Sequence, residues 1–150
     1  KQWIENLKGN IRIMSKSAGL KGIDIAGLHK NLPKTQRKQQ TIDVAKKYLN
    51  VDKRFRAAGI SRTFSIVSGR LLINDLQLQA QNLRNANVSG FVDFKNWNLS
   101  INSIFNIVTA DSYVVPIKAE IKGPINDYKT VWDYKGVVKY WENRFYGGEI

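Results

Sequence analysis

The chain has 150 residues, no cysteine, one histidine and a formal net charge of +12. This length suits one domain with its own core, and the composition excludes disulfides and zinc sites built from cysteine and histidine. The basic charge is concentrated in residues 1–63, which carry a net +11. That asymmetry predicts either an anionic partner, such as lipid headgroups or nucleic acid, or a solvated basic surface.

The first residue and the hydropathy pattern bear on where the chain comes from. Because it begins with Lys1 and not with methionine, we expect a piece of a longer protein. No apolar run approaches the roughly 20 residues that a membrane-spanning helix needs. An anchor, if the parent protein has one, would therefore lie outside these 150 residues.

The N-terminal part predicts one strand and two helices. Ile11 and Ile13 alternate with polar residues over 10–16, which is typical of a strand. Asp24 can cap a short helix that runs to about residue 31. The polar stretch 34–41 predicts a mobile loop, and the apolar stripe of residues 41–50 predicts an amphipathic helix. The pattern leaves open whether this helix continues over 51–58 or breaks at Asn50.

From residue 63 onward the pattern changes to strands. Every second residue from Trp97 to Ile107 is apolar except Ser103, and polar residues fill most of the gaps. A period of two indicates a strand with one apolar side. The expected strands cover residues 63–67, 70–73, 76–81, 86–94, 97–108 and 113–122. Gly123 and Pro124 are expected to end the sheet.

These elements predict an α+β fold. We expect a single twisted antiparallel β-sheet of about six strands, with two or three helices packed on one face. One domain would cover residues 1–150, with a basic helical insertion at about 24–58 and a β meander at about 63–122. A C-terminal helix is expected at about 134–145, where Val137, Trp141 and Phe145 repeat every four residues.

The covering of the single apolar face decides the functional interpretation. The chain's own helices would make an ordinary two-layer core, whereas an uncovered face could bind a partner protein or lipid acyl chains. The candidate lipid-contact residues are Trp97, Leu99, Ile101, Phe105, Ile117 and Ile121. They are apolar residues of the two most regular predicted strands, 97–108 and 113–122.

The basic segment provides a second candidate site, for an anionic surface. Its residues are Lys46, Lys47, Lys53, Arg54, Arg56 and Arg62. Each Lys or Arg near an anionic bilayer gains about 1 kcal/mol, so several together could dock a domain reversibly. Single-stranded nucleic acid is disfavoured, because its binding sites combine basic charge with exposed aromatic residues. Between residues 30 and 62 the aromatic residues are Tyr48 and Phe55.

The sequence carries no catalytic or cofactor-binding motif. His29 is the single imidazole, and the chain lacks the G-x-S-x-G turn that would position a serine nucleophile. Gly22 and Gly27 have the spacing of a phosphate loop, but Leu28 and His29 stand where that loop needs lysine and a hydroxyl residue. The carboxylates are scattered at expected turns. We therefore predict a protein that is not an enzyme, with no cofactor and no metal.

The order of short turn and strand phrases resembles the C-terminal region of the AsmA-like family of bacterial envelope proteins. Residues 19–25 resemble the family's G-x-x-x-G-I-D-L entry to a helix, and residues 64–78 its F-x-I-x-x-G-x-L…D-L-x-L hairpin. Residues 88–101 resemble x-x-G-x-V-D-L…L, and residues 115–124 the closing P-I-x-I-x-G-P strand. The chain departs from the pattern at 126–129, which lack the usual proline, and in the basic stretch 30–62.

The resemblance implies a cellular role and no reaction. Members of the family are tethered in the inner membrane with most of their mass in the periplasm. Long members look like bridges whose curved sheets carry phospholipid toward the outer membrane, and shorter ones affect outer-membrane assembly. We therefore expect a non-enzymatic periplasmic domain of an inner-membrane-anchored protein, with phospholipid, an anionic membrane surface or envelope proteins as partners. A basic polyanion-binding module is the alternative.

Overall fold

The structure is a computed structural model that describes residues 8–146 and, within them, the side chains of all but residues 15–21 and 54–56. Its sheet is an antiparallel meander of seven strands in sequence order. The strands are β1 (Gly9–Ile23), β2 (Leu49–Val67), β3 (Arg70–Ala80), β4 (Leu83–Asp93), β5 (Asn98–Val108), β6 (Val114–Pro124) and β7 (Lys129–Asp133). The predicted α+β class and antiparallel pairing are confirmed.

The expected strand number was too low by one. Gly123 and Pro124 were expected to end the sheet, but the chain turns and returns as β7, which pairs with β6 from Lys122↔Lys129 to Lys118↔Asp133. Five residues are too few for alternation to stand out from the neighbouring turn. The break expected at Asn74 and Asp75 is an irregularity within β3, which continues as one strand.

Three helices and one short 3₁₀ turn complete the described chain. The helices are α2 (Ile25–Asn31), α3 (Lys38–Tyr48) and α4 (Lys135–Phe145), and the turn is η1 (Leu32–Lys34). Asp24 caps α2 as predicted, because its Oδ1 accepts the Gly27 N–H at 3.0 Å. The expected loop 34–41 is shorter than predicted, since α3 already begins at Lys38.

The basic insertion contains a long strand that the sequence analysis did not assign. The prediction left residues 51–58 as a possible continuation of α3, within a helical insertion at about 24–58; instead β2 begins at Leu49. The chain leaves α3 at Leu49, whose backbone is extended, and Asn50 follows with a φ of 58°. β2 pairs with β1 from Gly9↔Ile66 to Ile23↔Leu49, so α2 and α3 connect two long neighbouring strands. The backbone pairing of two strands far apart in sequence therefore outweighs the local helical pattern.

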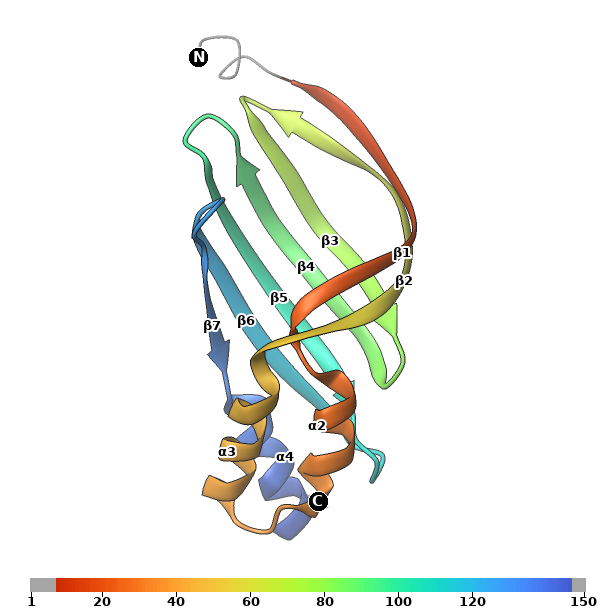
Figure 1. Cartoon of the computed structure of the whole chain (residues 1–150), viewed down its shortest axis with the longest axis vertical. Coiled ribbons are helices and arrows are strands. Elements are labelled where there is room, and N and C mark those ends of the chain that lie inside the picture. The colour runs from red at the N-terminus through yellow and green to blue at the C-terminus, as the bar shows by residue number, and fades with distance from the viewer. Residues whose placement is uncertain (1–7, 147–150) are drawn as a thin grey trace.

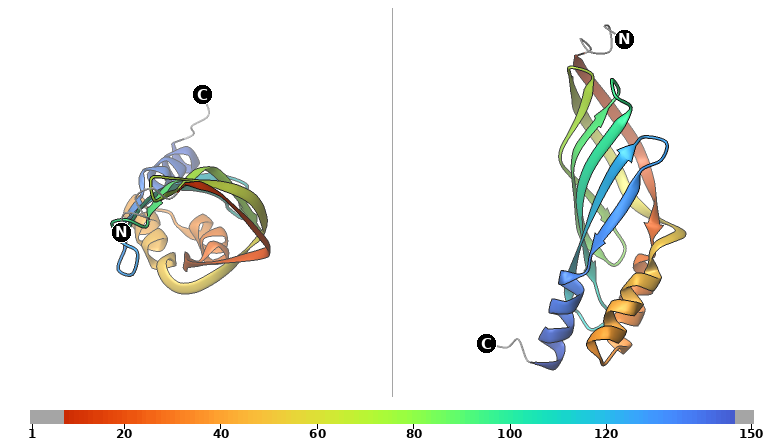
Figure 2. Two further views of the ribbon diagram at one scale, coloured as in Figure 1. Left: turned by 90° about the horizontal axis from the view of Figure 1, so that it is seen from above. Right: turned by 90° about the vertical axis from the view of Figure 1, so that its left-hand side faces the viewer.

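The sheet is strongly curled, and the helices gather at one end of it. In Figure 1 all three helices lie below the strands, and in Figure 2 the strands curl around a central space that α2 and α3 close at the lower end. The expected arrangement, with helices packed over one face, therefore needs correction. At the same end, the Trp132 indole N–H donates to Asn50 Oδ1 at 2.9 Å and links β7 to the start of β2.

The core lies where the helices meet the concave face. Leu28 and Leu32 from the helical segment are fully buried, and they belong to one apolar cluster with residues of the strands. The strand members on the concave face include Leu78, Ala86, Phe105, Ile107, Val115 and Ile117. α4 lies close to β6, and a Cβ at Gly136 would overlap the Pro116 carbonyl oxygen. A glycine is therefore required at that contact.

A buried arginine holds the helical end together. The Arg144 side chain is 12% exposed, and its Nε pairs with an Asp111 carboxylate oxygen at 3.2 Å. Its Nη2 donates to the Pro33 carbonyl oxygen at 2.6 Å, and its Nη1 to the Leu32 carbonyl oxygen at 3.3 Å. These bonds satisfy carbonyl groups beyond the C-terminus of α2 and join them to α4.

Candidate functional site

The concave face of the sheet is mostly apolar, and the helices cover one end of it. Facing pairs such as Leu71↔Val92, Gly90↔Ile101 and Ile101↔Ile121 continue the apolar row beyond the buried cluster. The part that no helix covers, which we call the open concave face, includes the half-buried residues Leu71, Ile73, Val92, Leu99, Ile101 and Ile121. Phe64 and Ile66 of β2 lie on the same side and also outside the main core cluster, but each is only 6% exposed.

Strand β1 extends the open concave face to the edge of the sheet. Ile11 faces Phe64 of β2, and Ile13 faces Arg62. The two isoleucines are 42% and 40% exposed. Exposed apolar side chains that continue one face form a patch of the kind that binds partners or ligands.

The structure separates the six candidate lipid-contact residues into three groups. Leu99, Ile101 and Ile121 belong to the open concave face. Phe105 and Ile117 lie on the same face but are 8% and 0% exposed within the helix-covered core. Trp97, which the alternation placed in a strand, is in the β4–β5 turn.

Trp97 lies at the end of the sheet away from the helices. Its φ is 57°, its side chain is 54% exposed, and its ring centroid is 6.5 Å from that of Phe94. The Ile125 N–H donates to the Trp97 carbonyl oxygen at 3.0 Å, which joins this turn to the β6–β7 turn. A large aromatic residue is therefore held at the rim of the open concave face.

The same turn is anchored by a buried carboxylate. Asp93 is 3% exposed and accepts the N–H groups of Lys95 and Asn96 at 2.9 and 3.2 Å. Burial alone would raise the pKa of Asp93, but the hydrogen bonds from Asn96 and Lys95 and the charge of Arg70 outweigh it. The pKa therefore lies below its ordinary value, and the carboxylate stays charged and organises the turn.

Ser103 marks the boundary between the covered and open parts. It faces Val88 on one side and Ala119 on the other, between Ile101 and Phe105 along β5. It is 4% exposed, and within the described part of the chain its hydroxyl has no hydrogen-bond partner. An unpaired buried hydroxyl is uncommon in proteins and is consistent with a ligand atom or water at this point.

The described basic candidates lie on α3 and β2. Lys46 and Lys47 lie on α3, with their ammonium groups 5.5 and 5.6 Å from the ring centroids of Tyr134 and Tyr48. Lys53 pairs with Asp24 at 3.2 Å. Arg62 lies further along β2 and bonds to backbone carbonyls of β3. The side chains of Arg54 and Arg56 lie outside the described residues.

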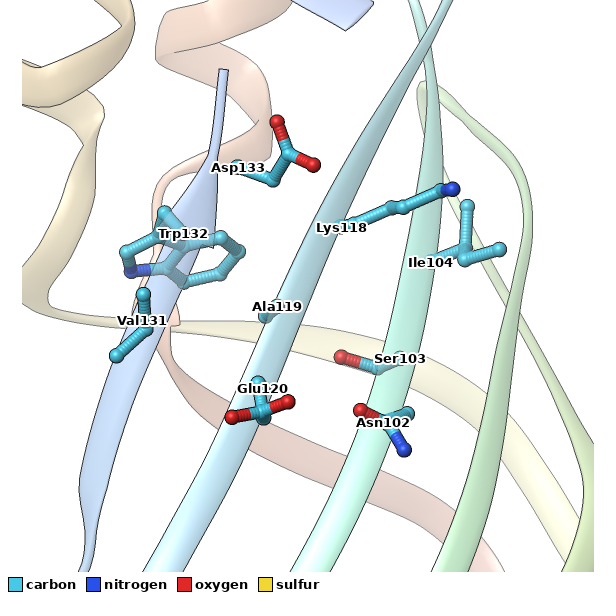
Figure 3. A pocket seen from close by; sticks show the side chains of 9 residues that line it. All are labelled: Asn102, Ser103, Ile104, Lys118, Ala119, Glu120, Val131, Trp132 and Asp133. Carbon is cyan, nitrogen blue, oxygen red and sulfur yellow. The ribbon is translucent and has the colours of Figure 1, made fainter. Parts of the chain in front are cut away.

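A shallow hollow of about 470 Å³ lies along β5, β6 and β7. Figure 3 shows the side chains that line it, among them Lys118, Glu120 and Asp133. These three alternate along their strands with Ser103, Ala119 and Trp132 of the concave face, so they project to the other side of the sheet. In the described part of the chain, no group of three carboxylate or imidazole side chains could hold a metal ion.

No protein-family model, curated protein or solved structure matches this chain. None of the helices within residues 8–146 is long and apolar enough to cross a bilayer.

Sequence reasoning missed the position of Arg62, although its signal was present. Ile60, Arg62, Phe64 and Ile66 alternate, which places all four on one side of a strand. In the structure Phe64 and Ile66 are each 6% exposed on the concave side, and Ser65 between them is exposed. The helical insertion was expected to reach about residue 58, and Arg62 was grouped with the basic residues of its flank. This grouping hid an arginine on an apolar face.

Proposed function

We propose that this chain is a non-enzymatic lipid-binding domain that holds acyl chains on its open concave face. The observation that carries the proposal is the part of a mostly apolar face that no helix covers. Its alternating residues continue directly from the buried core, yet no helix in the described chain covers them. An acyl chain supplies the apolar surface that this part lacks.

The expected energy suits reversible binding. Burying about 100 Å² of acyl chain gains about 2.5 kcal/mol at 25 cal/mol per Å². A longer contact would gain several times this amount, less the cost of ordering the lipid. Transport requires such a balance, because a lipid must enter the site and leave it again.

The cellular context of the proposal comes from the resemblance to AsmA-like proteins. In that context the chain is a periplasmic domain of an inner-membrane-anchored protein that serves phospholipid transport and outer-membrane biogenesis. The curled sheet with one apolar concave face is consistent with this role. The short turn phrases of the sequence support the same assignment.

The test compares the same substitution on the two faces of β5. Ile101→Asp places a carboxylate on the open concave face, whereas Ile104→Asp places one on the opposite face, across from Lys118. Binding of a phospholipid with a fluorescent acyl chain is measured by titration, and bound lipid is identified by native mass spectrometry. We expect Ile101→Asp to weaken binding at least tenfold and Ile104→Asp to leave it within twofold.

Two results would contradict the proposal. One is a wild-type protein that binds no lipid in either measurement. The other is an equal loss in both variants while circular dichroism and thermal melting show that both remain folded. Equal losses would mean that lipid adheres without preference for the concave face.

A further inference from the structure

We infer that Arg62 binds the phosphate of the lipid headgroup beside the open concave face. The inference rests on the proposed function and names the residue that binds the headgroup at the same site. It follows from the unusual placement of this one side chain.

Arg62 is a charged residue on an apolar surface. Its neighbours on the same side of β2, Phe64 and Ile66, are buried, and its cross-strand partner in β1 is Ile13. The guanidinium carbon of Arg62 lies 5.9 Å from the Phe64 ring centroid. The residue is half-buried, but its hydrogen bonds to β3 lie at an exposed position, so a ligand can reach the guanidinium.

The partners of Arg62 in the structure compensate it only in part. Nη1 donates to the Asp75 carbonyl oxygen at 2.8 Å, and Nη2 donates to the Asn74 carbonyl oxygen. Both acceptors are neutral. Within the described residues no carboxylate forms an ion pair with Arg62, and the Asp75 carboxylate accepts a bond from Gln77 instead. A guanidinium has five N–H donors, so it retains capacity for an anion.

The backbone around Arg62 also departs from a regular sheet. β2 and β3 pair at Ala57↔Ala80 and again between residues 65–67 and 70–72, but not over the described residues between these points. Figure 1 shows β2 bowing away from β3 along this stretch. Asp75 lies at the irregularity of β3, with a φ of 50°. Arg62 therefore connects β2 to β3 where the two backbones do not pair, beside the apolar face.

A phosphate fits this position better than an uncharged headgroup. Guanidinium groups bind phosphate oxygens through two parallel N–H bonds, and these charge-assisted bonds are about twice as strong as neutral ones. An uncharged lipid would leave the arginine charge uncompensated beside its acyl chains. We therefore expect the site to prefer a phospholipid over a lipid of the same acyl chains without phosphate.

The experiment measures binding of phosphatidylglycerol, diacylglycerol with the same acyl chains, and free glycerol phosphate. The variants are Arg62→Gln, Arg62→Lys and the control Arg12→Gln. Arg12 lies on the neighbouring strand but on the opposite face, where its Nη2 donates to Ser61 Oγ at 3.1 Å. The control therefore removes the same charge a short distance away without changing the concave face.

We expect Arg62→Gln to weaken phosphatidylglycerol binding about tenfold and to leave diacylglycerol binding unchanged. Arg62→Lys keeps the charge but loses the paired donors, so its loss should be intermediate. Arg12→Gln should change neither affinity. Free glycerol phosphate should bind far more weakly than phosphatidylglycerol, because it lacks acyl chains.

Several outcomes would overturn the inference. They are equal losses for both lipids in Arg62→Gln, an equal effect of Arg12→Gln, no loss in Arg62→Gln, or free glycerol phosphate binding as tightly as the lipid. If the wild-type protein binds both lipids equally and Arg62→Gln changes nothing, the headgroup assignment is wrong and the acyl-chain site stands. Failure of the wild-type protein to bind either lipid rejects both.

Discussion

The covered and open parts of the concave face have the same apolar pattern in sequence but differ in burial in the structure. Ile117 and Ile121 lie four residues apart on β6 and project to the same side. Ile117 is fully buried beneath the helical end, whereas Ile121 is half-buried beyond it. The difference comes from the helices, which pack at one end of the sheet. Alternation therefore identifies an apolar face, but it carries no information about what covers that face.

The largest expected effect is a difference in the stability of the protein between alanine variants at these two positions. Ile117→Ala creates a cavity in the covered part and should lower the free energy of unfolding by about 2–5 kcal/mol. Ile121→Ala removes a side chain that is already partly solvated and should cost about 1 kcal/mol or less. Urea unfolding of both variants measures the difference. Equal losses would mean that the open part is as tightly packed as the covered part.

A smaller expected effect is a loss of stability at alkaline pH that arises from Tyr140 at the helical end of the molecule. Tyr140 is 3% exposed, and its hydroxyl donates to Asp111 at 3.2 Å. Burial raises the pKa of Tyr140 above its ordinary value, and the Asp111 charge adds to this while Arg144 opposes it. The neutral phenol is therefore favoured in the folded state.

The sign of the pH dependence follows from linkage. The stabilisation is fully present below the pKa of an unfolded tyrosine, about 10, and is lost as the pH rises above it, because only the unfolded state releases the proton readily. Stability measured by urea unfolding should fall between pH 9 and pH 11. Tyr140→Phe should make this fall shallower, and an unchanged slope in that variant would assign the effect to other groups.

The strands that sequence reasoning predicted well are those whose partners are adjacent in the chain. The strands expected at 97–108 and 113–122 match β5 and β6 closely, since each pairs with its neighbour through a short turn. β1 and β2 were underestimated, because 25 residues of helix and connection separate them and their long pairing has no local signature. The helices over 24–31 and 134–145 were predicted well, because caps and four-residue spacing are local signals.

The sequence could predict that the candidate site is an apolar face, but not how much of that face the helices cover. Leu99, Ile101 and Ile121 could be assigned to an apolar face from alternation alone. The burial of Phe105 beneath helices could not, because it depends on how far the helical end reaches along the sheet. Arg62 interrupts a row of alternating apolar residues in the sequence. Its place on the apolar face could be assigned only once residues 49–67 were known to form one strand.

The smallest expected effect lies at the boundary between the two parts. Ser103→Ala removes a buried hydroxyl that has no partner among the described residues, at the cost of a single oxygen's contacts. Because leaving a buried hydroxyl unpaired costs free energy, the variant should be as stable as the wild type or more stable by up to about 1 kcal/mol. A loss of more than 1 kcal/mol in urea unfolding without lipid would show that the hydroxyl already has a partner within the protein. Measured again with saturating phosphatidylglycerol, the variant should gain less stability from the lipid than the wild type does, if the hydroxyl contacts the ligand at the inner limit of the open concave face.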